Sequence, residues 1–263
     1  MAFSNEIILN PDNDTKGHFA NSVSICENYA VVGCPQETIN DVQSGCVYVY
    51  KKTENNWVFQ TKIFPTENSS FDFFGNSVSI SADYIAVGAM NNNDRGERSG
   101  TVYLYERNID NWNFITKIYA NDLEDNDHFG YAVSIYNNLI IVGCPWKNNF
   151  SGASYLFVRS ECDQWTQQQK FLTNDNNKEC YFGGSVSITN ADYAIIGAWG
   201  DDTYGVDSGA AYIFIHDTFL FMIMMNGYNL KKYLHMMLLR ETLLDGQFQF
   251  ITITQLLAQN LVL

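Results

Sequence analysis

The amino-acid sequence predicts an all-β fold of four tandem β-propeller blades, each a repeat of four short antiparallel strands. The first observation is a phenylalanine that recurs about every 55 residues, at Phe19, Phe74, Phe129 and Phe182. The second is that each copy continues with alternating polar and apolar residues and then with an apolar run that ends in glycine. A repeat of this length is a unit that cannot bury its apolar faces alone. Stacked four-stranded units are typical of a β-propeller.

The second copy, residues 70–124, shows the expected strands most clearly. Residues 77–80 alternate serine with a β-branched residue, which is the period of a strand with two unlike faces. Residues 84–89 are almost wholly apolar, as expected of a central strand covered on both sides. Residues 100–105 and 112–119 supply the third and fourth strands. The other blades are expected at residues 15–69, 125–177 and 178–216.

Glycines close the second strand of every copy, and tryptophans open the fourth strand of three copies. The glycines are Gly33, Gly88, Gly143 and Gly197, and the tryptophans are Trp57, Trp112 and Trp165. A tryptophan could be a platform for a ligand, but its recurrence at one blade position favours packing between blades. We therefore expect these tryptophans to be buried between blades, together with the valines and isoleucines of the first and second strands.

These residues resemble the FG-GAP repeat, the blade unit of the integrin α-subunit propeller. The resemblance rests on Phe74-Gly75, Phe129-Gly130 and Phe182-Gly183, and on the Gly-Ala-Met or Gly-Cys-Pro that follows the second strand. A recurring Ser-Gly-x-x-Tyr and a following Trp are similar to the bacterial and protist form. The resemblance covers residues 5–216. It implies a non-catalytic module, often extracellular in this family, that binds a protein or glycan ligand through loops on one propeller face.

The resemblance also raises the question of calcium, because integrin-type blades often carry an Asp-rich calcium loop between their first and second strands. Here those connections are residues 26–28, 81–83, 136–138 and 189–192. A calcium ion takes about six to eight oxygen ligands, usually from a loop of about a dozen residues, which such short turns cannot supply. We therefore expect no cofactor, and the calcium role of the family is not carried over.

The composition restricts the class of partner. The 263 residues carry a formal net charge of −14, which argues against nucleic acid and anionic membrane as partners. No apolar run is long enough to span a membrane, and no secretory signal is visible, so localisation is left open. Cys34 and Cys144 stand where Ala89 and Ala198 stand in other copies, which indicates small buried residues, with a Cys34–Cys46 disulfide as the alternative.

No catalytic motif is evident, so we do not expect an enzyme. His18 and His128 precede the repeat phenylalanine where Phe73 and Tyr181 stand in the other copies, which favours a structural ring at this position. No nucleophile elbow or zinc-binding motif occurs. The alternatives are a propeller-type enzyme, a substrate-docking domain, or a truncated gene product without function.

The loops between the second and third strands differ from copy to copy, and variable loops on a rigid scaffold usually carry binding specificity. They span residues 36–42, 91–98, 147–150 and 200–207. The last loop contains Asp201, Asp202 and Asp207, which are the weak candidates for a metal site. A solvated acidic loop is the plainer interpretation of these three residues.

The repeat pattern stops after His216. Residues 217–263 have no counterpart earlier in the chain, and their literal interpretation is an amphipathic helix near residues 230–244. Their codons, shifted by one base, permit Trp-Ile-Gln-Leu-Lys-Lys-Ile-Phe and then a further repeat start with Phe-Gly and Gly-Ala. We interpret the tail as a frameshifted continuation without a selected fold, and we expect an incomplete propeller cut from a longer one.

Overall fold

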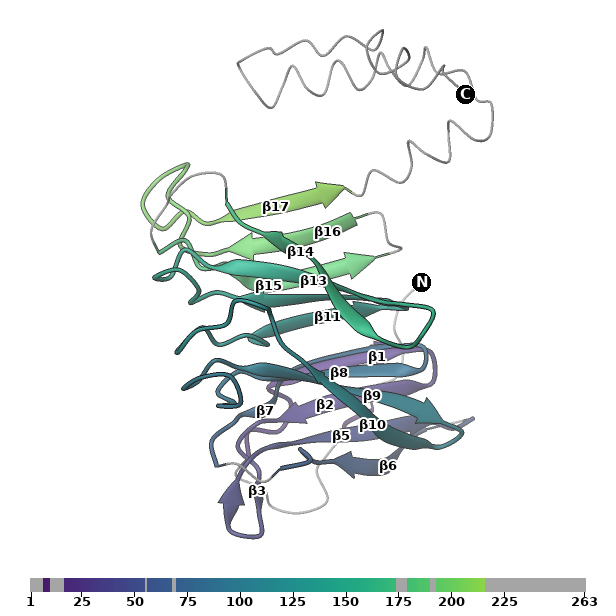
Figure 1. Cartoon of the computed structure of the whole chain (residues 1–263). Helices are drawn as coiled ribbons and strands as arrows, with labels where there is room; N and C mark the ends of the chain where they lie inside the picture. Colours follow the sequence, from purple (N-terminus) through teal and green to yellow (C-terminus); the bar gives the residue numbers. More distant parts are fainter. Residues whose placement is uncertain are drawn as a thin grey trace, which may run out of the picture. The chain divides into compact units, whose positions relative to one another are not determined.

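The computed structural model describes residues 7–9, 17–54, 56–67, 70–173, 179–189 and 193–215. Every regular element in these ranges is a β-strand, and the strands form four antiparallel sheets that follow one another in chain order (Figure 1). The predicted all-β propeller architecture is confirmed. No helix in the described part of the chain is long and apolar enough to cross a membrane.

The four sheets are the predicted blades. Blade one contains β1 (Ser22–Cys26), β2 (Tyr29–Cys34), β5 (Cys46–Lys52) and β6 (Trp57–Ile63), with a small hairpin of β3 (Thr38–Ile39) and β4 (Val42–Gln43) between β2 and β5. Blade two contains β7 (Phe74–Ser81), β8 (Tyr84–Ala89), β9 (Thr101–Asn108) and β10 (Asn111–Ile118). Blade three contains β11 (Ala132–Tyr136), β12 (Leu139–Cys144), β13 (Ala153–Arg159) and β14 (Trp165–Phe171). Blade four contains β15 (Phe182–Thr189), β16 (Tyr193–Ala198) and β17 (Ala210–Ile215).

The predictions for the end of the chain lie outside the described residues. Blade four has three strands within the described part of the chain, whereas we expected four. The tail interpretation concerns residues 217–263, which are also outside the described ranges. Both stay predictions.

Two-residue turns join the first and second strands of blades one to three, as expected from the short polar connections. The strand registers end at Cys26↔Tyr29, Ser81↔Tyr84 and Tyr136↔Leu139. The first turn residues Glu27, Ala82 and Asn137 have φ values of 52°, 46° and 52°, the left-handed conformation that tight hairpins require. The first strands therefore run directly into the buried central strands.

The repeat phenylalanine and its glycine form the junction between successive blades. The amides of Phe74, Phe129 and Phe182 donate to the carbonyls of Ser44, Ser99 and Ser151 in the preceding blade, at 3.1, 2.9 and 3.1 Å. All three rings are fully buried. Each packs edge-on against the third-strand tyrosine of its own blade, as Phe19 does against Tyr48 at 5.1 Å. The Phe-Gly motif therefore forms part of the contact between successive blades.

The second-strand glycines are needed because the next blade approaches them closely. A Cβ at Gly33 or Gly88 would lie 2.1 Å from the carbonyl oxygen of Gly75 or Gly130, and a Cβ at Gly143 would lie 1.9 Å from that of Gly183. No side chain fits at such distances. The two glycine motifs thus meet at every internal junction.

The hydrophobic core lies between blades. Val31 and Val49 of blade one pack with Val78 and Ile80 of blade two, and all four side chains are nearly inaccessible. Equivalent clusters join blade two to blade three and blade three to blade four. The extensive strand contacts between sheets, within the described ranges, all join one blade to the next in the chain.

The prediction that all first- and second-strand valines and isoleucines are buried is wrong at the two ends of the series. Val23 and Ile25 of β1 are 66% exposed, and Ile195 of β16 is 42% exposed. The physical reason is that none of these three residues has a neighbouring blade on its face in the described structure.

The tryptophans also differ from the prediction in degree. Trp57, Trp112 and Trp165 are half-buried. Trp112 packs on Tyr29 of the preceding blade at 5.5 Å, and Trp165 packs on Tyr84 at 6.1 Å. Trp112 and Trp165 lie between blades as expected, whereas Trp57 packs against residues of its own blade.

None of the six cysteines, all of which lie in the described ranges, forms a disulfide. Cys34 and Cys144 are buried, as their exchange with alanine predicted. Cys34 and Cys46 face each other across the β2–β5 pair without forming the alternative disulfide.

Candidate binding surface

The variable loops gather at one end of the blades, because each one follows a second strand and leads into a third. The fourth residue after each strand glycine is polar and anchors its loop: Glu37, Asn92, Lys147 and Asp201. Asn92 donates to the Asp72 carboxylate at 2.8 Å, and the Asp201 carboxylate accepts from the Tyr212 hydroxyl at 2.5 Å. The same repeat position therefore carries the polar residue that holds the loop, and the partner of that residue differs between blades.

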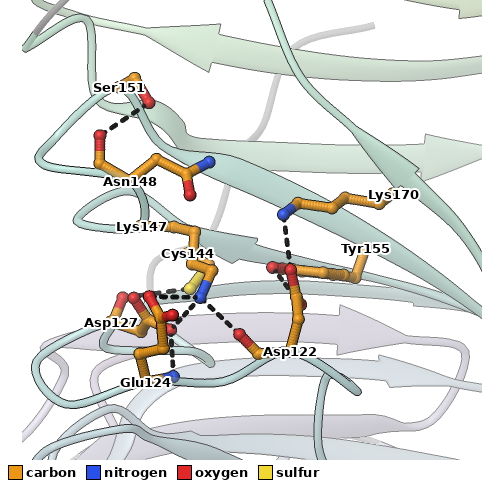
Figure 2. Close-up of polar contacts among 9 residues, drawn as sticks. All are labelled: Asp122, Glu124, Asp127, Cys144, Lys147, Asn148, Ser151, Tyr155 and Lys170. Atoms are coloured by element: carbon orange, nitrogen blue, oxygen red, sulfur yellow. Dashed lines mark hydrogen bonds and ion pairs between the residues drawn. The ribbon is translucent and has the colours of Figure 1, made fainter.

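Blade three holds its loop with a buried lysine. Figure 2 shows the Lys147 ammonium among the oxygens of Asp127 at 2.9 Å, Glu124 at 3.2 Å and the Asp122 carbonyl. Burial alone would lower the pKa of Lys147, but the hydrogen bond and charge of Asp127, with Glu124 adding to them, raise it. Lys147 is therefore a fixed cation, and it holds residues 122–127 against the loop.

A second pair braces the same loop from the outer strand. The Asp122 carboxylate accepts from the Tyr155 hydroxyl at 2.9 Å and from the Lys170 ammonium at 2.6 Å (Figure 2). Partial burial would raise the pKa of Asp122, but these two donors lower it. The carboxylates of Asp122 and Asp127 both accept hydrogen bonds from buried or partly buried donors. This network therefore holds the loop of blade three, and the surface that the loop forms, in place.

An aromatic cluster covers the loop end of blades three and four. It consists of His128, Tyr131, Trp146, Phe150, Tyr181 and Trp199. Trp146 is its centre, with ring centroids 4.8 Å from both His128 and Tyr131. Tyr181 and Trp199 stack at 5.0 Å with an angle of 13° between planes. Trp199 is 45% exposed and Phe150 is 42% exposed, so the cluster presents ring surface to solvent.

A hollow of about 750 Å³ adjoins this cluster. Its walls are His128, Trp146 and Phe150, together with the polar residues 124–127, Asn148 and Asn149. The Nδ1 atom of His128 is buried and has no hydrogen-bond partner in the described structure. Burial, aided by the nearby Arg98, lowers the pKa of His128, so the ring is neutral at pH 7. The hollow thus combines ring faces with amide and carboxylate groups.

The aromatic cluster breaks the repeat. At the position of Tyr131, blades one and two carry Asn21 and Asn76, which donate to backbone carbonyls of the next blade at 3.0 and 2.9 Å. At the position of Trp146 the other blades carry Gln36, Asn91 and Gly200, and at that of Trp199 they carry Pro35, Met90 and Pro145. The common blade architecture therefore does not require the rings of Tyr131, Trp146 and Trp199.

Gly184 makes room for one ring of the cluster. A Cβ at Gly184 would lie 1.7 Å from the Trp199 ring, so only glycine lets the indole lie flat on the backbone here. This position is Asn, Asn and Tyr in blades one, two and three.

The family comparison matches this organisation. A family model for the FG-GAP repeat matches residues 5–50, 57–105, 112–157 and 165–214, which is more than half of the chain. The chain belongs to the FG-GAP repeat family. Each FG-GAP match after the first begins in the outer strand of the preceding sheet, so the family unit is offset by one strand from the blades described here.

Other comparisons add little. A search of curated proteins found no match. Among solved structures, the crystal structure of the tricorn protease is similar, with 11% identity over 73% of this chain and a TM-score of 0.36. This chain spans 20% of that one.

Two of the three weak metal candidates of the fourth FG-GAP repeat, Asp201 and Asp202, have carboxylates that accept hydrogen bonds from their own blade. The Asp201 carboxylate accepts from the Thr203 amide at 2.9 Å as well as from Tyr212. The Asp202 carboxylate accepts from the Asp207 amide at 2.7 Å. Within the described ranges, no three or more His, Cys, Asp or Glu side chains are placed so that they could hold a metal ion.

The loop predicted at residues 147–150 lines the candidate surface, but the sequence analysis did not identify most of its rings. We predicted that His128 and Tyr181 share a ring position, and the structure places both in the aromatic cluster. The sequence analysis did not predict Trp146 or Trp199 as site residues, because neither recurs in the other repeats. A comparison of the FG-GAP copies position by position, for departures at the loop end, would have found them.

Proposed function

We propose that this chain is a non-catalytic binding module that holds a protein or glycan ligand on the aromatic cluster. The observation that supports this most is the concentration of six rings at one loop end, four of which, Tyr131, Trp146, Phe150 and Trp199, stand at positions where the other blades carry no ring. Family membership supports the same class of function, because propeller blades of this kind serve as rigid carriers of binding loops.

The chemistry of the surface suits such a ligand. Tyrosine and tryptophan bury a large area while losing few rotamers, which is why they dominate contact centres. The polar wall formed by residues 124–127, Asn148 and Asn149 offers hydrogen bonds that orient a bound group. The net charge of −14 makes nucleic acid and anionic membrane poor ligands for it.

The test uses the full chain, labelled and applied to a glycan array and to a peptide array. We expect ligands on one of the two arrays, and we expect Trp146→Ala and Trp199→Ala to weaken their binding by about tenfold or more, as is typical of contact-centre residues. Tyr136→Ala is the matched control, because this half-exposed ring lies at the turn end of blade three.

Two results would count against the proposal. One is binding that neither tryptophan variant weakens, which would place the ligand elsewhere. The other is no binding of the wild-type chain on either array. Turnover of a bound array ligand would instead favour the alternative of a propeller-type enzyme.

A further inference from the structure

We propose that two copies of this chain join head to tail, blade four of one on blade one of the other, and that two such junctions close an eight-bladed ring. The proposal concerns assembly and goes beyond the proposed ligand binding. It rests on the apolar residues at the two ends of the blade series, none of which is a ring of the aromatic cluster.

Every internal blade has two apolar faces, which we name by their neighbours. The leading face meets the preceding blade and includes the first-strand pair Val78 and Ile80 of blade two, which are 7% and 5% exposed. The trailing face meets the next blade and includes Val31 and Val49 of blade one, which are fully buried. Each internal junction therefore joins a trailing face to a leading face.

The first and last blades have the same apolar faces. Within the described ranges, no blade lies against the leading face of blade one or the trailing face of blade four. On the leading face of blade one, Val23 and Ile25 stand at the positions of Val78 and Ile80 and are each 66% exposed. On the trailing face of blade four, Ile195 and Ile213 stand at the positions of Val31 and Val49. They are 42% and 66% exposed. Apolar faces of this kind mark sites of association.

One hydrogen bond between neighbouring blades recurs at all three internal junctions. Its donor position in blade one and its acceptor position in blade four have no neighbouring blade within the described ranges. Ile80 N donates to Ser24 Oγ at 3.1 Å, Ile135 N to Ser79 Oγ at 3.0 Å, and Ile188 N to Ser134 Oγ at 3.1 Å. The next acceptor in this series is Ser187 Oγ, which has no blade after it within the described ranges. The donor that precedes the series is Ile25 N, which has no blade before it there. The two ends thus match each other as donor and acceptor.

The glycines of blade four leave the space that a neighbouring blade would fill. At Gly33, Gly88 and Gly143 an added methyl group would strike the carbonyl of the next blade. At Gly197 the nearest atoms within the described ranges all belong to Ser185 of the same blade. Likewise, a Cβ added at Gly209 would meet no described atom nearer than 3.4 Å, whereas one at Gly45, Gly100 or Gly152 would lie within 2.3 Å of the next blade's phenylalanine carbonyl.

These observations favour a second copy as the occupant. The face that blade four presents is the one that blade one is built to meet, and each chain carries one of each. A head-to-tail contact either closes into a ring or continues as a filament. Two copies supply eight blades, which lies within the usual range of closed propellers of about four to eight blades.

The test measures the mass of the full chain in solution by size-exclusion chromatography with light scattering. We expect the wild-type mass to be twice that of one chain, and we expect Ile25→Glu and Ile195→Glu each to halve it. Val58→Glu is the matched control, because Val58 is 49% exposed on the outer strand β6 and belongs to neither end face. It should stay dimeric.

Mixing the two variants gives the sharpest result. Every junction between identical variants contains one altered face, whereas a mixed pair can form one junction from two intact faces. The equimolar mixture should therefore recover the dimer mass. Circular dichroism checks that each variant keeps its strands, and Val23→Glu with Ile213→Glu repeats the test on a second pair.

Three results would overturn the proposal. A wild-type chain that stays monomeric at high micromolar concentration would mean that the ends are covered from within the chain or by another protein. A dimer that survives both variants, or a mixture that stays monomeric, would mean that the copies meet through other surfaces. Because the end-face variants spare the aromatic cluster, ligand binding should survive them, and failure of either proposal can be recognised separately.

Discussion

The glycine that closes each second strand should be essential at an internal junction and dispensable at the end of the series. In Gly88→Ala the new methyl group would lie 2.1 Å from the Gly130 carbonyl oxygen and 2.3 Å from Ser77 Oγ. The Ser77 hydroxyl donates to that same carbonyl at 2.8 Å and is buried, so separating the blades also breaks this bond. Overpacking costs about 1–3 kcal/mol. The lost hydrogen bond adds about 1 kcal/mol, so we expect a loss of roughly 2–4 kcal/mol in the free energy of unfolding.

Gly197→Ala is the matched comparison, because the same change meets only the movable hydroxyl of Ser185. Replacing glycine in a strand by alanine otherwise stabilises by about 0.5–1 kcal/mol, so the net change should be within about 1 kcal/mol. Both variants are measured by urea unfolding in the Ile25→Glu background, which prevents a second copy from covering Gly197. Equal losses in the two variants would refute the close-approach explanation of the motif.

The remaining predictions concern the loop end and the tail. Lys147→Met should destabilise the chain by about 3 kcal/mol in urea unfolding, because it leaves the buried Asp127 carboxylate without its cation; a change below about 1 kcal/mol would contradict this. The pKa of Asp122 is lowered on folding, so its contribution to stability is present above its unfolded pKa near 4 and is lost as the pH falls through the lower folded value. The melting temperature should therefore fall less steeply between about pH 5 and 2 in Asp122→Asn than in the wild type, and parallel curves would exclude this role. Gly184→Ala should displace the Trp199 ring and weaken ligand binding as much as Trp199→Ala does, with unfolding by urea nearly unchanged. Sequencing the transcript should show the repeat continuing in the neighbouring frame after residue 216; a confirmed present frame with no downstream repeat would exclude the frameshift.

Periodicity made most of the fold predictable. The spacing of Phe74, Phe129 and Phe182 located the junctions, and the alternation in residues 77–80 located the first strands. Burial at the ends was mispredicted, because a repeat pattern gives Ile25 and Ile80 the same environment although only one of them has a preceding blade. A sequence repeat specifies the shape of a blade, and the number of neighbours decides which of its faces are covered.

The candidate surface was less predictable for the opposite reason. The centre of the aromatic cluster depends on Tyr131, Trp146 and Trp199, which do not repeat, and the contact between Tyr131 and Trp199 joins two blades. Local patterns carry no information about such a pairing. The supporting network of Lys147 and Asp127 was missed as well, because the lysine occupies a position that holds Glu, Asn or Asp in the other copies.

The binding surface can be tested most directly through the five tryptophans of the chain. Each indole N–H gives its own signal in a nitrogen–proton NMR spectrum of the ¹⁵N-labelled chain, and single Trp→Phe variants assign the signals. On titration with a ligand found on the arrays, the signals of Trp146 and Trp199 should shift while those of Trp57, Trp112 and Trp165 stay in place. Shifts confined to the three blade tryptophans, or none at saturating ligand, would contradict the assignment of the aromatic cluster as the binding site.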